Sequence, residues 1–233
     1  MKNYSYIGIS FIILVFGIIF VPRIIDRVQT GSTLQGNRLN RTTNSDLAYI
    51  SLNGERKKVP DFLLTNQDNL PISNEDFLGK VYVVEFFFTS CPSICPIMNK
   101  NMKILESKYG SRSDFGIVSI TIDPEKDTPM ELKKYAEIYE VFSPNWHFLT
   151  GDRSYIYELA NAGFNIFAEI NPAVAGGFEH QGYFALVDQN GYLRSRRDDY
   201  GNPIVYYLGI DNDDVEVQDI ALLEQDIQIL LNN

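Results

Sequence analysis

Cysteine is almost absent from this sequence. The 233 residues contain two, Cys91 and Cys95, which lie four positions apart. Two cysteines are too few for the disulfide framework of a small secreted domain, and two so close together rarely arise as inert core residues. We therefore expect any chemistry of this protein to involve this pair.

Basic residues are also scarce. The chain has 20 lysines and arginines against 30 aspartates and glutamates, a net charge of −10. A nucleic-acid-binding protein needs a basic face to neutralise phosphates, so this composition argues against that class. The charge is uneven, because residues 1–45 hold five basic residues and one acidic residue, which leaves −14 on the remainder. This division predicts a basic leader joined to an acidic body.

Charge is missing altogether from one stretch of the leader. Residues 3–22 form an uncharged and largely apolar run. A helix of about 20 residues reaches roughly 30 Å, the thickness of a bilayer's hydrocarbon core. Tyr4 and Tyr6 stand at one end of the run, as aromatic residues do at membrane interfaces. We therefore predict one transmembrane helix, in a membrane anchor over residues 1–25.

Two alternative interpretations of the leader find less support. A cleaved signal peptide would end in a small-x-small site, which does not follow the apolar run, and the leader has no cysteine to carry a lipid. A mitochondrial transit peptide would contain arginine, and residues 1–20 have none. Basic residues flank the run on both sides, so charge does not set its orientation. Residues 26–58 are polar and turn-rich, which predicts a tether.

The remaining residues, 59–233, alternate between strand and helix patterns. Continuous β-branched and aromatic runs indicate buried strands, a capping box indicates a helix start at Thr128, and Asn190-Gly191 is a strong hairpin signal. This order predicts an α/β protein of thioredoxin-like fold, with a central mixed sheet flanked by helices. The expected elements are strands over 81–88, 115–122, 184–188 and 192–195, and helices over 97–109, 128–139, 153–162 and 215–231.

The two cysteines fall between the first predicted strand and its helix. Open α/β sheets place their sites at the carboxyl ends of strands. A helix amino terminus also favours the thiolate over the thiol. Disulfide oxidoreductases of this fold usually have two residues between their cysteines, whereas three separate Cys91 from Cys95. This spacing permits a disulfide, and it also lets both sulfurs face one metal ion such as Cu(I), or Zn(II) with further ligands.

Histidine is as rare as cysteine, and the two residues have different settings. His147 lies in an aromatic run that is typical of a strand end, where a structural role is expected. His180 lies in a glycine-rich loop before the strand that begins at residue 184, and in a thioredoxin-like sheet this loop lies beside the cysteines. Oxidoreductases of the fold place a cis-proline there, but no proline stands between Pro172 and Pro203. A histidine in its place converts a redox site into a site with two sulfur ligands and one nitrogen ligand.

Four blocks of sequence together resemble the Sco/SenC family. They are residues 87–96 (FFTSCPSICP), 122–129 (IDPEKDTP), 145–151 (NWHFLTG), and His180 followed by 183–188 (YFALVD). The similarity covers residues 60–196 in consistent order and spacing. Members of this family are membrane-anchored, thioredoxin-like copper proteins that help to assemble the dinuclear copper site of cytochrome c oxidase.

This resemblance implies a function and a site. Cys91, Cys95 and His180 would be the ligands of one copper ion per monomer, and the protein would be a copper chaperone. Its partners would be the copper-site subunit of cytochrome c oxidase or another copper protein, together with the lipid bilayer and no nucleic acid. The head would face the periplasm from the inner membrane, or the intermembrane space of a mitochondrion as the less favoured location.

Three questions stay open at the level of sequence. Asp123 follows the second predicted strand, where it either supports the copper ligands or shapes the turn into the next helix. The same dithiol could serve a thiol–disulfide oxidoreductase that keeps a partner's copper-site cysteines reduced, or a copper or redox sensor without turnover. Residues beyond 197 resemble the family less closely, so their role is undetermined.

Overall fold

The computed structural model describes residues 10, 14–18, 21–22, 47–52, 54–198, 200–211 and 217–232. It divides the chain into two compact units, residues 1–41 and 42–233. No helix among the described residues is long and apolar enough to cross a membrane. Most of the apolar run 3–22 lies outside the described residues, so the transmembrane helix stays a prediction.

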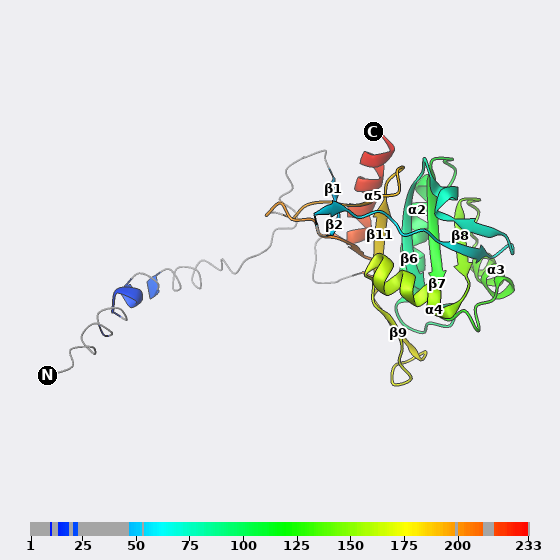
Figure 1. Cartoon of the computed structure of the whole chain (residues 1–233), viewed down its shortest axis with the longest axis horizontal. Helices are drawn as coiled ribbons and strands as arrows, with labels where there is room; N and C mark the ends of the chain where they lie inside the picture. Colours follow the sequence, from blue (N-terminus) through cyan, green and yellow to red (C-terminus); the bar gives the residue numbers. More distant parts are fainter. Residues whose placement is uncertain are drawn as a thin grey trace. The chain divides into compact units, whose positions relative to one another are not determined.

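A mixed sheet forms the centre of the second unit (Figure 1). Its strands, in spatial order, are β1 (Ala48–Tyr49), β12 (Leu193–Ser195), β11 (Tyr183–Val187), β6 (Val81–Phe87), β7 (Phe115–Thr121), β8 (Trp146–Thr150), β4 (Leu63–Asn66) and β5 (Pro71–Ser73). β6, β7 and β8 are parallel, and the strands on either side run antiparallel to them. All seven residues of β6 and of β7 are buried, as expected for apolar strands covered on both faces.

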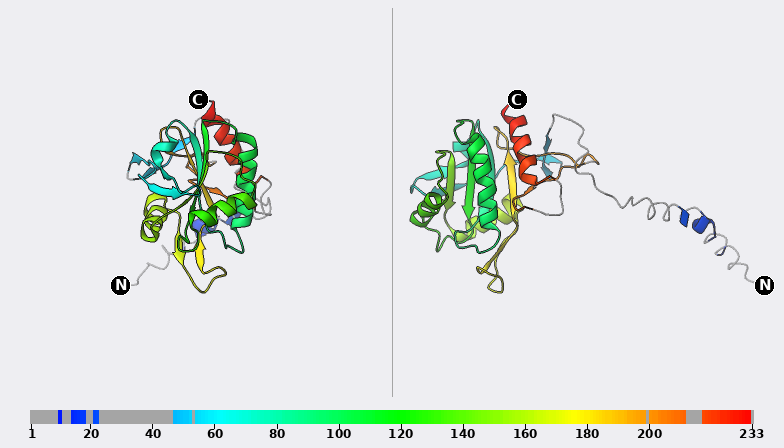
Figure 2. Two further views of the ribbon diagram at one scale, coloured as in Figure 1. Left: turned by 90° about the vertical axis from the view of Figure 1, so that its right-hand side faces the viewer. Right: turned by 180° about the vertical axis from the view of Figure 1, so that it is seen from behind.

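Helices cover both faces of this sheet (Figure 2). α2, α3 and α5 lie on one face, where the Asn99 side chain of α2 bonds to Tyr135 of α3 and Tyr109 of α2 bonds to the α5 backbone. The opposite face packs against α4 and the π-helical turn η2, through Phe86 and Phe164. The helices are α2 (Cys95–Tyr109), α3 (Pro129–Ile138), α4 (Arg153–Glu158), η2 (Leu159–Phe164) and α5 (Asp219–Leu231), with the 3-10 helix η1 (Asn74–Phe77).

The predicted α/β architecture is confirmed, with small shifts of its boundaries. α2 begins at Cys95, two residues before the expected start, because Pro96 is well placed in a first helical turn. The Thr128 hydroxyl caps α3 by accepting a hydrogen bond from the Glu131 N–H, and the hairpin around Asn190-Gly191 joins β11 to β12.

Residues 26–58 contain structure that the prediction of a tether did not include. Within this range, β1 pairs with β12 at the edge of the main sheet. β2 (Ser51–Leu52) and β3 (Glu55–Arg56) form a separate two-stranded sheet. Leu47 and Ile50 are buried in the core around β1. Tertiary pairing therefore orders a polar segment that has no sustained periodicity of its own.

The carboxyl-terminal segment belongs to the same compact unit. The short strand β13 (Tyr207–Leu208) pairs with β11, and α5 packs beside it. Arg196 forms a buried bidentate ion pair with Asp226 of α5. The Tyr207 hydroxyl donates a 2.6 Å hydrogen bond to the same carboxylate. This buried group fastens α5 to the sheet.

Candidate metal centre

Three donor atoms converge at the carboxyl end of β6. The sulfurs of Cys91 and Cys95 and a ring nitrogen of His180 all lie within 4.8 Å of one another. Cys91 belongs to the loop after β6, Cys95 is the first residue of α2, and His180 ends β10 (Phe178–His180). Both cysteines are free thiols. Two soft sulfur donors with an imidazole nitrogen form a set that suits Cu(I).

The loop between β6 and α2 turns so that one cysteine sulfur meets the helix start. The Cys91 N–H donates to the Phe88 carbonyl, which begins the turn. Ile94, at the cap position of α2, makes no side-chain capping bond. Instead the Cys95 N–H donates to the Cys91 sulfur over 3.4 Å. The Cys91 sulfur therefore occupies the position of an anion at a helix amino terminus, which favours its thiolate form.

The two thiols differ strongly in acidity because they share one hydrogen bond. That hydrogen bond to Cys95, together with one to His180, lowers the pKa of the Cys91 thiol although burial opposes the shift. The same bond to Cys91, followed by burial, raises the pKa of the Cys95 thiol. The shared hydrogen bond therefore makes Cys91 the more acidic thiol of the pair and favours the proton on Cys95. Binding of a metal by both sulfurs has to release this proton.

His180 presents one ring nitrogen to the sulfurs. Its Nε2 atom lies 3.4 Å from the Cys95 sulfur. Its Nδ1 atom is buried and has no hydrogen-bond partner among the described residues. The ring packs edge-on against Phe88, with centroids 5.9 Å apart. Nε2 is therefore the nitrogen placed to bind a metal, while Phe88 fixes the ring orientation.

A small β-hairpin carries His180 to the cysteines. β9 (Ala168–Ile170) pairs with β10, and His180 lies opposite Ala168. Phe178 contacts Phe88, with ring centroids 5.1 Å apart. The tip of the hairpin reaches the cysteine loop, because a Cβ atom added to Gly176 would lie 2.9 Å from the Phe88 ring and 3.0 Å from Pro92. The hairpin and the cysteine loop thus support each other through direct packing.

We expect the substitution Gly176→Ala to weaken metal binding about tenfold, a loss comparable to that of a supporting contact of a metal ligand. The added methyl group would push the hairpin, and His180 with it, away from Cys95. Gly177→Ala is the matched control, since Gly177 also has a positive φ, +82° against +91°, but faces open space. A competition titration with Cu(I) measures both variants, and equal losses would show that backbone strain alone is responsible.

Beneath Cys95 lies a group of buried polar side chains. The Asn99 amide donates to the Cys95 carbonyl over 2.8 Å and contacts the Tyr135 hydroxyl. On the same face of the sheet, Glu85 accepts a 2.7 Å hydrogen bond from Ser119 through one carboxyl oxygen, and the other has no partner among the described residues. Burial raises the pKa of Glu85 to about 7. The floor of the centre is thus a polar group in an otherwise apolar core.

The other predicted site residues lie outside the donor cluster. The Asp123 carboxylate is not one of its ligand atoms. Its backbone N–H donates to the Thr121 hydroxyl, and burial first and Asp127 second raise the pKa of its side chain. His147 lies in β8, where Nδ1 is 3.3 Å from the Asn66 amide, and burial lowers the pKa of its ring. These contacts place Asp123 in the turn after β7 and His147 beside Asn66 of β4.

One residue of the site neighbourhood was not singled out from the sequence. Asp127 is fully buried and hydrogen-bonds to Thr89, two residues before Cys91. The sequence contains a signal for Asp127. Like Asp123, it follows the predicted strand over 115–122, and the predicted strand over 81–88 precedes the two cysteines.

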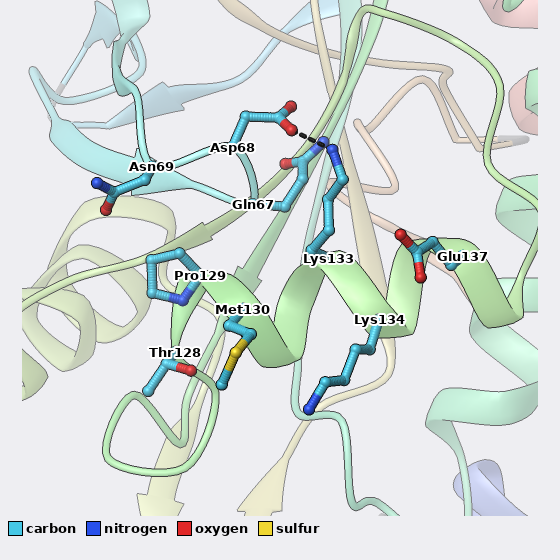
Figure 3. A pocket seen from close by; sticks show the side chains of 9 residues that line it. All are labelled: Gln67, Asp68, Asn69, Thr128, Pro129, Met130, Lys133, Lys134 and Glu137. Atoms are coloured by element: carbon cyan, nitrogen blue, oxygen red, sulfur yellow. Dashed lines mark hydrogen bonds and ion pairs between the residues drawn. The ribbon is translucent and has the colours of Figure 1, made fainter.

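A separate hollow lies between α3 and the turn after β4 (Figure 3). Lys133 and Asp68 form an ion pair across it. None of the three clustered donors lines this hollow, so it is not part of the candidate centre. Its lining residues are Gln67, Asp68, Asn69, Thr128, Pro129, Met130, Lys133, Lys134 and Glu137.

The fold and the donor cluster together define a thioredoxin-like protein with a buried cysteine–cysteine–histidine group. The SCO1/SenC family model matches residues 51–210. The SCO1 protein homolog of Bacillus subtilis (strain 168) is 38% identical over 136 residues, which cover 58% of this chain and 70% of the relative. The SCO2-like protein of Rickettsia felis is 33% identical over 163 residues, 66% of this chain and 77% of the relative. The chain belongs to the SCO1/SenC family.

Solved structures agree with this assignment. A SCO1/SenC family lipoprotein from Bacillus anthracis str. Ames shares 29% identity at a TM-score of 0.63, covering 75% of this chain and 95% of its own. BsSco, a member of the Sco family of cytochrome c oxidase assembly proteins with an identified disulfide switch, shares 31% identity at a TM-score of 0.60, covering 75% and 93%. Both likenesses confirm the predicted thioredoxin-like fold.

Proposed function

We propose that this protein is a membrane-anchored copper chaperone that serves the assembly of the copper site of cytochrome c oxidase. The observation that carries the proposal is the convergence of Cys91, Cys95 and His180 within 4.8 Å at a helix amino terminus. Family membership supports it, since BsSco is described as a member of a family of cytochrome c oxidase assembly proteins. One Cu(I) ion would be the cargo of each monomer.

The three site residues would have different roles in binding and releasing copper. Cys91 offers a thiolate before copper arrives, and Cys95 completes the pair of sulfur ligands by losing its proton. His180 adds a nitrogen ligand from the hairpin, which is a separate element from the cysteine loop. Copper would pass to the acceptor by exchange of these ligands one at a time. Formation of a Cys91–Cys95 disulfide would remove both sulfur ligands, so the redox state of the pair would control loading.

The proposed location follows from the leader. Residues 1–25 would anchor the chain in the inner membrane, and residues 26–58, which join the head through β1, would tether the head in the periplasm. The uncharged run 3–22 supports this arrangement. The acidic body, with −14 outside residues 1–45, would favour a basic docking surface on the copper-accepting partner.

Anaerobic titration of the full chain with Cu(I), in mild detergent and in competition with a chelator, tests the proposal. The reduced wild type should bind one ion tightly, and His180→Ala should bind it about 100-fold more weakly, as for loss of one ligand of a small donor set. The oxidised wild type should bind none. Equal affinity of His180→Ala and wild type would remove His180 from the proposed site.

A thiol–disulfide oxidoreductase is the second candidate, and one observation favours it. Hydrogen bonds to Cys95 and His180 lower the pKa of the Cys91 thiol, which is the direction expected for the attacking thiol in disulfide exchange. Under this alternative Cys91→Ser would abolish reduction of a partner disulfide, and His180→Ala would bind copper as the wild type does. A copper sensor would instead bind its partner only in the copper-loaded state, without transfer of the ion.

A further inference from the structure

Asp127 is a buried carboxylate that gathers hydrogen bonds from two sides of the site. It lies in the loop between β7 and α3 and is 0% exposed. The Thr89 N–H donates to its Oδ2 atom over 3.0 Å, and the Thr89 hydroxyl donates to its Oδ1 atom. The Thr121 hydroxyl, at the end of β7, also donates to Oδ2. Three donors therefore satisfy this buried charge.

These bonds connect the cysteine loop to the neighbouring strand end. Thr89 is the second residue after β6 and stands two residues before Cys91. Thr121 also accepts a 3.0 Å hydrogen bond from the Asp123 N–H. The Asp127 N–H donates to the Asp123 carbonyl over 2.9 Å. Asp127 thus holds the first turn of the cysteine loop and the loop after β7 in one fixed arrangement.

Burial of the Asp127 carboxylate costs free energy, which indicates that its hydrogen bonds do more than shape the loop after β7. An ionised carboxylate without water is expensive to bury unless charge-assisted hydrogen bonds satisfy it. Here Thr89 donates two of the three hydrogen bonds that Asp127 accepts. Thr89 stands two residues before Cys91 in the chain. Within the cysteine loop, residues 88–94, the described backbone hydrogen bonds are of two kinds. The Cys91 N–H donates to the Phe88 carbonyl, and the Ile94 carbonyl accepts from N–H groups of α2. Asp127 adds hydrogen bonds from outside the loop, at Thr89, to the apolar packing of the hairpin on Phe88 and Pro92.

We propose that Asp127 is a positioning residue of the metal centre, which holds Thr89 so that the Cys91 sulfur meets Cys95 and His180. This role rests on the proposed function in so far as copper is the ligand, but the positioning of the two sulfurs does not depend on copper. Asp127 touches neither the metal donors nor the cargo. It acts through Thr89, and Asp123 is connected to the cysteine loop through the same carboxylate.

Asp127→Asn in the full chain tests the proposal, because the amide is uncharged and offers one accepting oxygen, in place of two, to the three donors of Thr89 and Thr121. We expect Cu(I) affinity to fall about tenfold to 100-fold, the usual range for partners that orient metal ligands. Thr89→Val, which removes the hydroxyl and keeps the N–H, should show a smaller loss, and Thr89→Ser should keep wild-type affinity. Asp226→Asn weakens a buried ion pair away from the site and controls for general destabilisation.

A second readout without copper separates this proposal from the proposed function. The equilibrium of the Cys91–Cys95 pair with glutathione disulfide, which yields the protein disulfide and two glutathione thiols, reports how well the two sulfurs are held together. Asp127→Asn should lower this equilibrium constant about tenfold, while Asp226→Asn should keep the wild-type value. A wild-type constant in Asp127→Asn overturns the proposal. If the wild type fails to bind Cu(I), the chaperone function fails, and the glutathione measurement still decides the role of Asp127.

Discussion

Replacing Cys95 with serine is expected to lower the affinity for Cu(I) about 1,000-fold or more, a loss of about 4 kcal/mol. Cys95 provides one of two sulfurs, and a serine hydroxyl is a hard, protonated oxygen that Cu(I) binds poorly. The serine hydroxyl can still donate a hydrogen bond to the Cys91 sulfur, so the variant removes the second sulfur ligand and keeps a donor at this position.

The chain offers a matched control for this variant in the same loop. The Ser93 hydroxyl lies 3.7 Å from the Cys91 sulfur, so Ser93→Ala changes a neighbour of the sulfur without removing a ligand. Ser93→Ala should bind Cu(I) nearly as the wild type does. Both variants should unfold cooperatively in urea, which shows that the fold persists. Tight Cu(I) binding by Cys95→Ser would rule out the two-sulfur site.

The second large effect concerns stability, and we expect Asp226→Leu to lower the free energy of unfolding by about 3–5 kcal/mol. The side chains of Arg196 and Asp226 are 8% and 2% exposed, so the variant leaves a buried guanidinium without its carboxylate. Burial first, against the opposing effect of Arg196, raises the pKa of Asp226. Burial of this ion pair therefore costs free energy. The pair contributes to stability only when both Arg196 and Asp226 are present.

The double variant Arg196→Met, Asp226→Leu completes this test. Replacing a buried ion pair by apolar side chains is often neutral or stabilising, whereas removal of one partner is not. Urea denaturation of the two single variants and the double variant gives their coupling. We expect the double variant to be more stable than Asp226→Leu. Equal stability of these two would mean that α5 does not depend on the pairing.

The elements that dominate the fold were predictable because their signals are local. The continuous apolar run of β6, the Thr128 cap of α3 and the Asn190-Gly191 turn each specify their own conformation with little help from the rest of the chain. The positions of Cys91 and Cys95 followed directly, since they stand between a strong strand and a strong helix. His180 was singled out because it stands in the loop before the 184–188 strand where oxidoreductases of the fold carry a cis-proline, and the family resemblance implied the same residue.

The elements that were not predicted depend on tertiary contacts. β9 and β10 have three residues each and no clear alternation, and they are held by the packing of Phe178 on Phe88. β1 has two residues and exists because β12 offers an open edge. The bonds of Asp127 to Thr89 join positions 38 residues apart. Such contacts leave no periodic pattern in the sequence.

The proposed centre thus has two parts. The cysteine loop was predictable from the sequence, whereas the β9–β10 hairpin that carries His180 was not. The strand-to-helix loop places two sulfurs at a helix amino terminus, and the hairpin brings the imidazole across to them. Gly176 permits this approach by its lack of a side chain. The donor atoms of the centre thus come from two separate elements, the cysteine loop with the start of α2, and β10.

Copper K-edge X-ray absorption of the Cu(I)-loaded full chain tests the central claim most directly. We expect a Cu(I) edge with two sulfur scatterers and one imidazole nitrogen in the wild type, and the loss of the nitrogen alone in His180→Ala. A copper environment with the same scatterers in wild type and His180→Ala, or with fewer than two sulfurs in the wild type, would contradict it.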